Sequence, residues 1–413
     1  MPSPTNTELL NACIHCGLCL TRCPTYRETG DEAASPRGRL YLMRALEEGR
    51  LQAGPEVNPH FDSCVGCRAC ETACPAGVQY GSLLERVRAE HVEPSRPAGV
   101  GLRAWRKIVR DVLPDARRLS LAAIPGRLTK RLLVRRGRAP GWLPGGLARA
   151  LELLPDGPLR PASWLPEWTP AQGPERGVVA FLPGCAGSAL YASSGRAAVH
   201  LLTRAGYRVW VPPALGCCGA VHLHEGDRTG AIQRVEANLA ALQGQEFEAI
   251  ISHAGGCGAT LHEYGSLLPE RGEAQTLASK ATDLASFLVR VGLPAPSPRP
   301  AVRVTWHDPC HLAHGLGVRS APRQLLASLP NVELVELPEA DWCCGGAGTY
   351  TLKQAALSDS LLNHKLDHIR STHATQVITA NPPCLMQLAR GLQQQLPEVQ
   401  VVHLADFLAA YHP

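Results

Sequence analysis

The chain has 413 residues, a formal net charge of +5 and a hydrophobic content of 45%, which predicts a globular protein of two or three domains. Aromatic residues make up only 5% of it, which argues against a base-stacking surface for nucleic acid. We expect neither a signal peptide, since no charged segment precedes an apolar core, nor a transmembrane helix, since no run approaches 18 apolar residues. Sixteen cysteines in such a chain indicate a reducing, cytoplasmic compartment and metal binding.

Two cysteine runs near the N-terminus share one spacing. Each holds four cysteines separated by two, two and three residues and followed by proline, and the second run repeats the first 51 positions later. This is the spacing of two-cluster ferredoxins, in which the fourth cysteine of each run ligates the cluster of the other run. We therefore expect one 4Fe–4S cluster on Cys13, Cys16, Cys19 and Cys74 and a second on Cys23, Cys64, Cys67 and Cys70.

Zinc is the alternative metal, because paired C-x2-C runs also make zinc sites. A zinc ion needs four ligands and has no use for three evenly spaced cysteines plus a fourth before proline, twice over. Gly17 and Gly66 would let the backbone approach an inorganic core closely. The pattern favours two iron–sulfur clusters.

Residues 1–100 are predicted to form a mostly helical, ferredoxin-type domain around these clusters. Ser35 and Pro36 are typical of a helix start, and Gly49 is typical of its end. A second helix is predicted from Tyr80 to about His91.

Residues 101–176 are predicted to form a basic helical and proline-rich linker. From Arg103 to Arg138 there are twelve Lys or Arg residues against Asp111 and Asp115. Apolar residues between them allow basic amphipathic helices. One interpretation is an interfacial patch that rests on anionic lipid or on an acidic partner subunit. The other is a solvated connector that covers the cluster domain.

Residues 177–295 and 296–413 are predicted to be two copies of one α/β domain. Short apolar runs alternate with helical stretches, which is typical of parallel, Rossmann-like sheets. The cysteines recur at near-constant offsets of 125, 126 and 127 residues, which indicates a duplication. The fold class is thus α+β multidomain. The predicted strands are 178–182, 207–211, 249–252, 302–306, 332–336 and 376–379.

Each copy carries four cysteines that follow strands, where parallel sheets place their ligand sites. Four converging thiols suit another Fe–S cluster or a zinc ion. Buried reduced cysteines that act as small hydrophobes would explain one or two of them but not two matched sets. We expect no catalytic thiol. The additional candidate ligands are Cys185, Cys217, Cys218 and Cys257, then Cys310, Cys343, Cys344 and Cys384.

Histidines accompany these cysteines. His222 and His224 follow the Cys217-Cys218 pair, and His307 and His311 flank Cys310. Hydrogen-bonded core histidines are the simpler interpretation. The alternative is that they donate to a cluster or tune a nearby quinone. His15, inside the first run, is interpreted as a spacer that affects a cluster's potential.

The pieces together resemble the iron–sulfur subunits of bacterial glycolate oxidases over nearly the whole chain. The resemblance rests on stretches such as 12–19, 23–26, 36–39, 216–221, 256–259, 343–350 and 363–365. The duplicated domain alone is similar to the CCG domain shared by anaerobic glycerol-3-phosphate dehydrogenases, lactate-utilisation proteins and heterodisulfide reductases. Thr260 and Gln387 stand where heterodisulfide-reductase-type domains have a fifth cysteine, which argues against a noncubane cluster and thiol–disulfide chemistry.

The resemblance implies the electron-transfer subunit of an oxidoreductase acting on CH–OH groups. FAD-binding partner subunits would oxidise glycolate to glyoxylate, and this chain would pass the electrons toward a membrane quinone. The chain lacks a G-x-G-x-x-G fingerprint after a strand, so FAD is expected on partner subunits only. The location implied is cytoplasmic and peripheral on the inner face of the cell membrane. The alternatives are an equivalent subunit of an anaerobic glycerol-3-phosphate or D-lactate dehydrogenase, and a docking scaffold whose CCG domains hold zinc.

Overall fold

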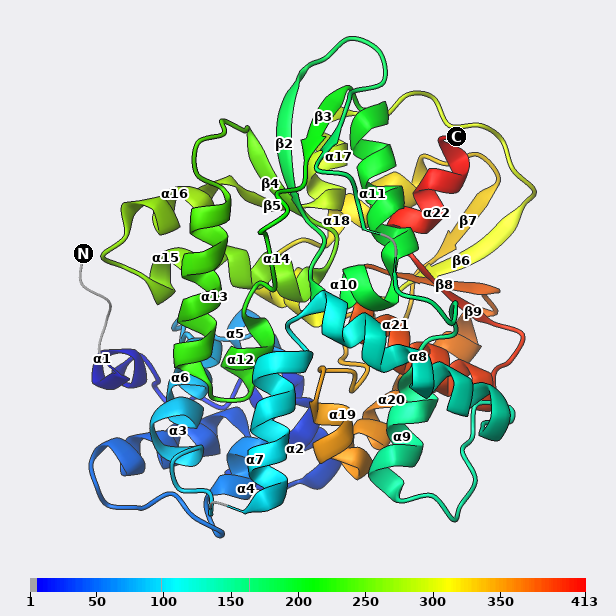
Figure 1. Cartoon of the computed structure of the whole chain (residues 1–413). Coiled ribbons are helices and arrows are strands. Elements are labelled where there is room, and N and C mark those ends of the chain that lie inside the picture. Colours follow the sequence, from blue (N-terminus) through cyan, green and yellow to red (C-terminus); the bar gives the residue numbers. More distant parts are fainter. Residues whose placement is uncertain (1–5, 98, 163) are drawn as a thin grey trace.

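The computed structural model describes residues 6–97, 99–162 and 164–413 (Figure 1). Residues 6–97 are mostly helical, as predicted, and loops carry most of their cysteines. Their core packs Met43, Phe61 and Leu83, all fully buried, against the cysteine loops. The helices of this part are α1 (Asn6–Asn11), α2 (Pro24–Thr29), α3 (Pro36–Glu47), α4 (Asn58–Asp62), α5 (Ala69–Thr72) and α6 (Tyr80–Val87).

Helix α3 begins where the sequence predicted. The Ser35 hydroxyl accepts a hydrogen bond from the amide of Gly38 at 2.9 Å, and Pro36 is the first helical residue. Glu48, rather than Gly49, caps its end, and Gly49 follows in the left-handed region with φ +70°.

The second predicted helix is not a regular α-helix up to His91. α6 ends at Val87 and continues as a π-helical turn, Arg88–Val92. This wider turn accompanies two hydrogen bonds, both 2.8 Å, that the Arg88 guanidinium donates to the carbonyls of Phe61 and Cys64.

A connector of helices α7 (Val100–Lys107), α8 (Ala116–Leu133) and α9 (Gly145–Leu153), with a π-helical turn at Ile108–Val112, leads to the sheets. It is anchored at both ends. Trp105 donates a 2.8 Å hydrogen bond to Glu225. Arg149 forms a bidentate pair with Asp359, with both distances at 2.8 Å.

Two parallel sheets follow, which confirms that part of the predicted fold class. The first has the order β1-β3-β2-β4-β5 and the second β7-β6-β8-β9, so β2 to β5 and β6 to β9 have one topology. All neighbouring strands are parallel except β1, which pairs antiparallel with β3. The strands are β1 (Trp168–Thr169), β2 (Gly177–Leu182), β3 (Tyr207–Trp210), β4 (Ala249–Ser252), β5 (Ala281–Asp283), β6 (Val302–Trp306), β7 (Val332–Val335), β8 (Gln376–Thr379) and β9 (Gln400–His403).

The six predicted strands are present within one residue of their predicted bounds. Strands β1, β5 and β9 were not predicted; β1 and β5 are only two and three residues long. β2 and β4, by contrast, are almost wholly buried apolar runs, as expected for central parallel strands covered on both faces.

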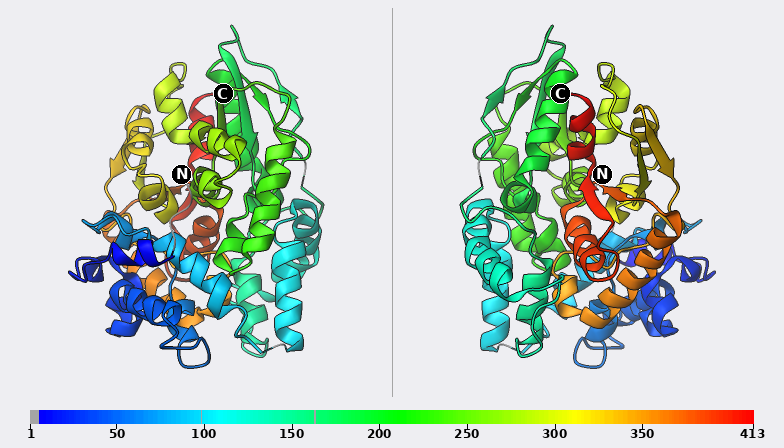
Figure 2. Two further views of the ribbon diagram at one scale, coloured as in Figure 1. Left: turned by 90° about the vertical axis from the view of Figure 1, so that its left-hand side faces the viewer. Right: turned by 90° about the vertical axis from the view of Figure 1, so that its right-hand side faces the viewer.

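The two sheets share one core. Phe181, Leu201 and Phe287 of the first pack in the same buried cluster as Trp306 and Leu408 of the second. Helix α11 packs on α22 at this junction (Figures 1 and 2). The helices of the first half are α10 (Cys185–Leu190), α11 (Ala192–Arg204), α12 (Ala220–His224), α13 (Arg228–Ala241), α14 (Gly255–His262), α15 (Tyr264–Leu267), α16 (Gly272–Lys280) and α17 (Leu284–Val291). Those of the second are α18 (Ser320–Ala327), α19 (Tyr350–Lys353), α20 (Ala355–Thr372), α21 (Pro382–Gln395) and α22 (Leu404–Tyr411), with a π-helical turn at His311–Gly315.

The N-terminal domain lies below the sheets, against the second half (Figure 2). Arg22 pairs with Asp341 at 2.5 Å and Arg27 with Glu339 at 2.6 Å, from the loop after β7. The Tyr350 hydroxyl donates a hydrogen bond to the carbonyl of Ser63 at 3.0 Å. The loops that follow the strands therefore face the cysteine runs.

Candidate metal centres

The first predicted cluster set meets at one hollow in the N-terminal domain. Cys13, Cys16 and Cys19 line it from one side, and Cys74, with Pro75, lines it from the other. Cys70, which we assigned to the second set, also reaches its wall. Burial raises the pKa of the Cys19 thiol to about 11. Four thiols from two runs thus converge as a cubane requires.

The two cysteine loops have the same backbone conformation around their second cysteine. His15 (φ 55°) and Gly17 (φ 83°) flank Cys16 in the left-handed region. Gly66 (φ 69°) and Arg68 (φ 63°) flank Cys67 in the same way. Successive turns of this kind aim amide groups toward one point and form a cradle for an anion. The repeated turns therefore fit a negatively charged iron–sulfur core as well as the thiols do.

The second predicted set, Cys23, Cys64, Cys67 and Cys70, is buried. Burial raises the pKa of the Cys67 and Cys70 thiols well above the usual value, and each of these groups interacts with the other members of the set. The structure thus brings these four residues together too. Cys16 is the only exposed member of the sixteen cysteines, all of which lie in the described ranges.

A buried guanidinium faces the second set. Arg39 has no exposed surface and donates hydrogen bonds to the carbonyl of His60 (2.6 Å) and the hydroxyl of Ser63 (2.9 Å). Burial opposes the thiolate of Cys64, yet the charges of Arg39 and Arg88 lower its pKa. A buried cation beside thiols rather than carboxylates balances a negatively charged cluster. Sequence reasoning missed Arg39, although it ends the stretch 36–39 on which the family resemblance rests.

Four thiols converge in the first CCG domain at the carboxyl edge of its sheet. They interact in the order Cys185, Cys217, Cys218 and Cys257, and the pKa of Cys217 is raised to about 12. Asn238 of α13 donates to the carbonyl of Cys217 (2.9 Å), and the Tyr264 hydroxyl donates to the carbonyl of Cys218 (3.0 Å). These bonds hold the Cys217-Cys218 turn.

The second CCG domain repeats this arrangement and adds a histidine. Its thiols interact in the order Cys310, Cys343, Cys344 and Cys384. The ring of His307 lies with its ligand atoms within 4.8 Å of the Cys344 and Cys384 sulfurs. Within the described ranges, neither ring nitrogen of this buried histidine has a hydrogen-bond partner. Leu182 stands at the matching place in the first domain.

In the second domain, contacts between neighbouring thiols raise the pKa of Cys343 and Cys384 but lower that of Cys344 and Cys310. Contacts with neighbouring thiols, helped by His307, lower the pKa of Cys344 well below its usual value. A contact with Cys343, helped by His311, does the same for the pKa of Cys310. The thiolate is the form that binds metal, and the second site adds a histidine nitrogen beside two of its thiols, so it offers the larger set of candidate ligands.

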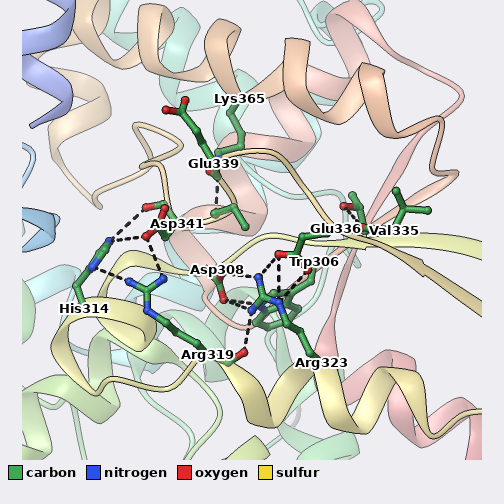
Figure 3. Close-up of polar contacts among 12 residues, drawn as sticks. Trp306, Asp308, His314, Arg319, Arg323, Val335, Glu336, Glu339, Asp341 and Lys365 are labelled. Atoms are coloured by element: carbon green, nitrogen blue, oxygen red, sulfur yellow. Dashed lines mark hydrogen bonds and ion pairs between the residues drawn. The ribbon is translucent and has the colours of Figure 1, made fainter. Parts of the chain in front are cut away.

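A polar network fixes the turns of the second site (Figure 3). The buried Asp308 carboxylate accepts from Arg323 at 2.8 and 3.0 Å and from the Trp306 indole at 2.5 Å. The Lys365 ammonium donates to the carbonyls of Glu339 (2.6 Å) and Ala340 (3.2 Å), and burial lowers its pKa to about 8. These residues position Cys310 and the loop that leads to Cys343. Lys365 could have been found, since it ends the stretch 363–365 that supports the family resemblance.

The second N-terminal set and the second CCG site lie side by side. Burial raises the pKa of the Cys67 thiol, and the negative charge of the nearby Cys310 raises it further. Cys67 shares one buried cluster with Trp342 and Cys343, and Cys310 packs against it. Two thiol sets that are far apart in the sequence therefore meet in one hydrophobic cluster.

The remaining histidines are mostly satisfied, as the simpler interpretation predicted. His222 pairs with Asp227 at 2.9 Å, and His224 pairs with Glu85 at 3.3 Å. His311 differs, since its ring faces the Cys310 sulfur at 3.6 Å. His15 lines the first hollow.

Thr260 and Gln387, which stand where heterodisulfide-reductase-type domains have a fifth cysteine, form hydrogen bonds within the fold. The Thr260 hydroxyl donates to the carbonyl of Gly256 at 3.0 Å. The Gln387 amide donates to the hydroxyl of Ser358 at 2.9 Å. Neither offers a thiol.

Comparison with known families identifies two kinds of domain in the chain. The model of a 4Fe-4S dicluster domain matches residues 9–78. The model of a cysteine-rich domain, abbreviated CCG, matches twice, at residues 179–262 and 304–389. The chain is therefore an iron–sulfur protein that joins a dicluster domain to two cysteine-rich domains.

Relatives that are similar over most of the chain show to which family of iron–sulfur proteins it belongs. A probable glycolate oxidase iron-sulfur subunit of Bacillus subtilis is 37% identical over 97% of this chain and 93% of its own length. The glycolate oxidase iron-sulfur subunit of Escherichia coli is 32% identical over 92% and 90%. A subunit of the CoM/CoB fumarate reductase from Methanothermobacter marburgensis is 27% identical over 98% of this chain and 72% of its own length. The chain belongs to the family of glycolate oxidase iron–sulfur subunits.

Proposed function

We propose that this chain is the electron-transfer subunit of a glycolate oxidase complex. FAD-bearing partner subunits oxidise glycolate to glyoxylate, and this chain carries the electrons toward a membrane quinone. The observation that carries the proposal is the row of three thiol sets, from the hollow at Cys16, through the buried set at Cys67, to the site at Cys310. Whole-length similarity to two glycolate oxidase subunits supports the substrate.

We assign the ligands of two 4Fe–4S clusters as the sequence predicts. Cys13, Cys16, Cys19 and Cys74 hold the first, and Cys23, Cys64, Cys67 and Cys70 hold the second. Such clusters supply one-electron carriers whose potentials depend on burial, charge and hydrogen bonding. Exposed Cys16 marks the face where an electron donor approaches, and burial of the second set isolates it from solvent.

The second CCG domain holds the third thiol set of the proposed relay. His307, Cys344 and Cys384 bring three ligand atoms within 4.8 Å of one another, and Cys343 and Cys310 continue the row of interacting thiols, which suits a further iron–sulfur cluster or zinc. Zinc has no redox chemistry, so only a cluster there continues the relay. The first CCG domain has the same four thiols but Leu182 instead of histidine.

We propose the domain divisions 1–100, 101–176, 177–295 and 296–413, in which the first two thiol sets share the dicluster domain and the third lies in the second CCG domain. The dicluster domain receives electrons from the FAD subunits, and the linker connects it to the sheets. The CCG domains receive the electrons from the dicluster domain and dock the partner subunits. Peripheral attachment to the inner face of the cell membrane would bring the relay to its quinone.

The experiment is reconstitution with the FAD subunits. Cys67→Ser should abolish glycolate-dependent quinone reduction while the FAD subunits still reduce an artificial acceptor. Retention of quinone reduction would refute the relay. Replacing glycolate by D-lactate or glycerol 3-phosphate separates the alternative dehydrogenases. A scaffold whose CCG domains hold zinc alone would contain zinc and no iron beyond the dicluster domain.

A further inference from the structure

Helix α8 of the connector buries polar side chains and exposes apolar ones, the reverse of the usual arrangement. An ordinary surface helix buries its apolar face and exposes its polar face. In α8 the buried side chains are Ser120, Ala123, Arg127 and Lys130, whereas leucines face outward. A buried polar face opposite exposed large apolar residues is the informative departure from normal burial.

The buried polar face is explained by the linker that follows. The Arg127 guanidinium donates to the carbonyls of Pro155 (3.3 Å) and Pro158 (3.2 Å), and the Lys130 ammonium donates to the carbonyl of Leu154 (2.7 Å). Proline-rich chain offers carbonyls without amide partners, and the two cations satisfy them. The hydrogen bonds of Arg127 and Lys130 therefore determine which face of α8 is buried. They do not explain the apolar residues on its outer face.

The outer face is an apolar stripe bordered by arginines. Leu121, Leu128 and Leu132 are 56%, 48% and 67% exposed. Their spacing of seven and four residues places them on one side of the helix. Arg117 and Arg131 border the stripe on one side, and Arg118 borders it on the other, as a rotation of about 100° per residue requires.

The arginines leave this face strongly positive. Arg118 lies 3.7 Å from Asp115 and Lys130 lies 3.3 Å from Asp156. Among the ion pairs of the described residues, none joins a carboxylate to Arg117, Arg131, Arg135 or Arg136.

We propose that the outer face of α8 docks the protein on an anionic phospholipid bilayer. Leucines would enter the interface between headgroups and acyl chains, and the flanking arginines would contact phosphate groups, as in interfacial amphipathic helices. Within the described part of the chain, every helix is too short or too polar to cross a bilayer, so attachment would be lateral. The orientation of the complex toward its quinone rests on the proposed function, but the binding does not.

Lipid is favoured over an acidic protein by the arrangement of charge. Arginines on both borders of an apolar stripe match a plane of phosphates above hydrocarbon. Helix α8, in cyan to teal, lies on the outside of the molecule, where its inner side packs on α10 and α9 (Figures 1 and 2). This position leaves the helix open along its length to a flat surface.

Sedimentation of the full, cluster-loaded chain with vesicles tests the proposal. Vesicles of phosphatidylcholine with a third phosphatidylglycerol serve as the anionic surface, and pure phosphatidylcholine serves as the neutral one. We expect binding to the anionic vesicles that weakens between about 0.05 and 0.5 M salt, because exposed charges are screened. Leu121→Gln, Leu128→Gln and Leu132→Gln together should weaken it at least about a hundredfold, since each leucine loses its burial in lipid.

Leu51→Gln with Val289→Gln is the matched control, because both residues are exposed apolar side chains elsewhere. This variant should bind as the wild type does. A second variant, Arg117→Gln with Arg135→Gln and Arg136→Gln, should lose anionic binding without loss of iron. Failure of the wild type to bind anionic vesicles, or unchanged binding by the leucine variant, would overturn the proposal.

A protein partner gives a different outcome. If the leucine variant lost the FAD subunits on co-purification while vesicle binding stayed unchanged, the face would be a protein interface and the proposal would be wrong. Electron transfer from glycolate to a water-soluble acceptor should persist in the leucine variant. This result separates failure of docking from failure of the relay.

Discussion

The ring of His307 and the sulfur of Cys344 lie within 4.8 Å of each other, whereas the first CCG domain has Leu182 at the place of His307. The duplication therefore produced two thiol sites of unequal chemistry. Both retain four cysteines. The second adds the His307 imidazole beside Cys344 and Cys384, with ring nitrogens that lack hydrogen-bond partners in the described part of the chain, and the pKa of Cys310 and of Cys344 is lowered by contacts with neighbouring thiols.

We predict that metal beyond the dicluster domain depends on the second site. Cys344→Ser should remove that metal, whereas its counterpart Cys218→Ser should remove little. His307→Leu, which copies the first domain, should weaken retention of the metal by about ten- to a hundredfold, the usual cost of a lost supporting ligand. Elemental analysis after dialysis against a chelator measures this. Equal losses from Cys344→Ser and Cys218→Ser would show that the sites are equivalent.

Arg39 should raise the potential of the cluster that Cys64 holds. A buried positive charge stabilises the reduced, more negative state, so Arg39→Met should lower the midpoint potential by about 60 mV or more, a tenfold change in a one-electron equilibrium. Redox titration followed by electron paramagnetic resonance (EPR) measures it. Arg88→Met should act in the same direction, because Arg88 also lowers the pKa of the Cys64 thiol. Arg50→Met, in an exposed pair with Glu48, is the control and should leave the potential unchanged.

The electron donor should dock beside Cys16. Ile14 and Leu18 flank this exposed cysteine and are 70% and 57% exposed. Ile14→Gln with Leu18→Gln should slow reduction of the chain by the FAD subunits by at least about tenfold, because the apolar contact is lost. Stopped-flow reduction measures the rate. Dithionite should reduce the variant as fast as the wild type, and a slow reaction with dithionite would instead indicate a damaged cluster.

Acid should loosen the junction of the two CCG domains. The rings of His253 and His403 lie 5.1 Å apart, and His403 Nε2 donates to the carbonyl of His253 at 3.0 Å. Burial lowers the pKa of His403 from 6.5 to about 4. Between these values the unfolded chain binds a proton that the folded chain does not, so stability falls as the pH drops, by about 3 kcal/mol for this group.

The measurement is the urea midpoint at pH 6.5 and pH 5. His403→Asn keeps an oxygen that can cap the amide of Ala405, as the ring now does at 3.1 Å, and should lose part of the acid sensitivity. An unchanged pH dependence in this variant would exclude His403 as its source.

The thiol sites could be predicted from sequence because cysteine spacing determines them. The strands that lead to cysteines are rich in valine, isoleucine and aromatic residues, so their positions were also predictable. The burial of polar side chains by α8 was not predictable, because Arg127 and Lys130 find their hydrogen-bond partners among carbonyls of residues 154–158, far along the chain. Leu132 has the spacing of an apolar face that packs inward, yet it is exposed. His307 stands out in the sequence beside Cys310, but only the packed structure reveals that its ring nitrogens lack partners among the described residues.

The most direct test of the relay is EPR spectroscopy of the complete complex mixed anaerobically with glycolate. The account predicts that glycolate alone generates the signals of two reduced 4Fe–4S clusters, at about eight iron atoms or more per copy of this chain. Reduction of the flavin without any iron–sulfur signal, in protein that contains this iron and shows the signals with dithionite, would contradict it.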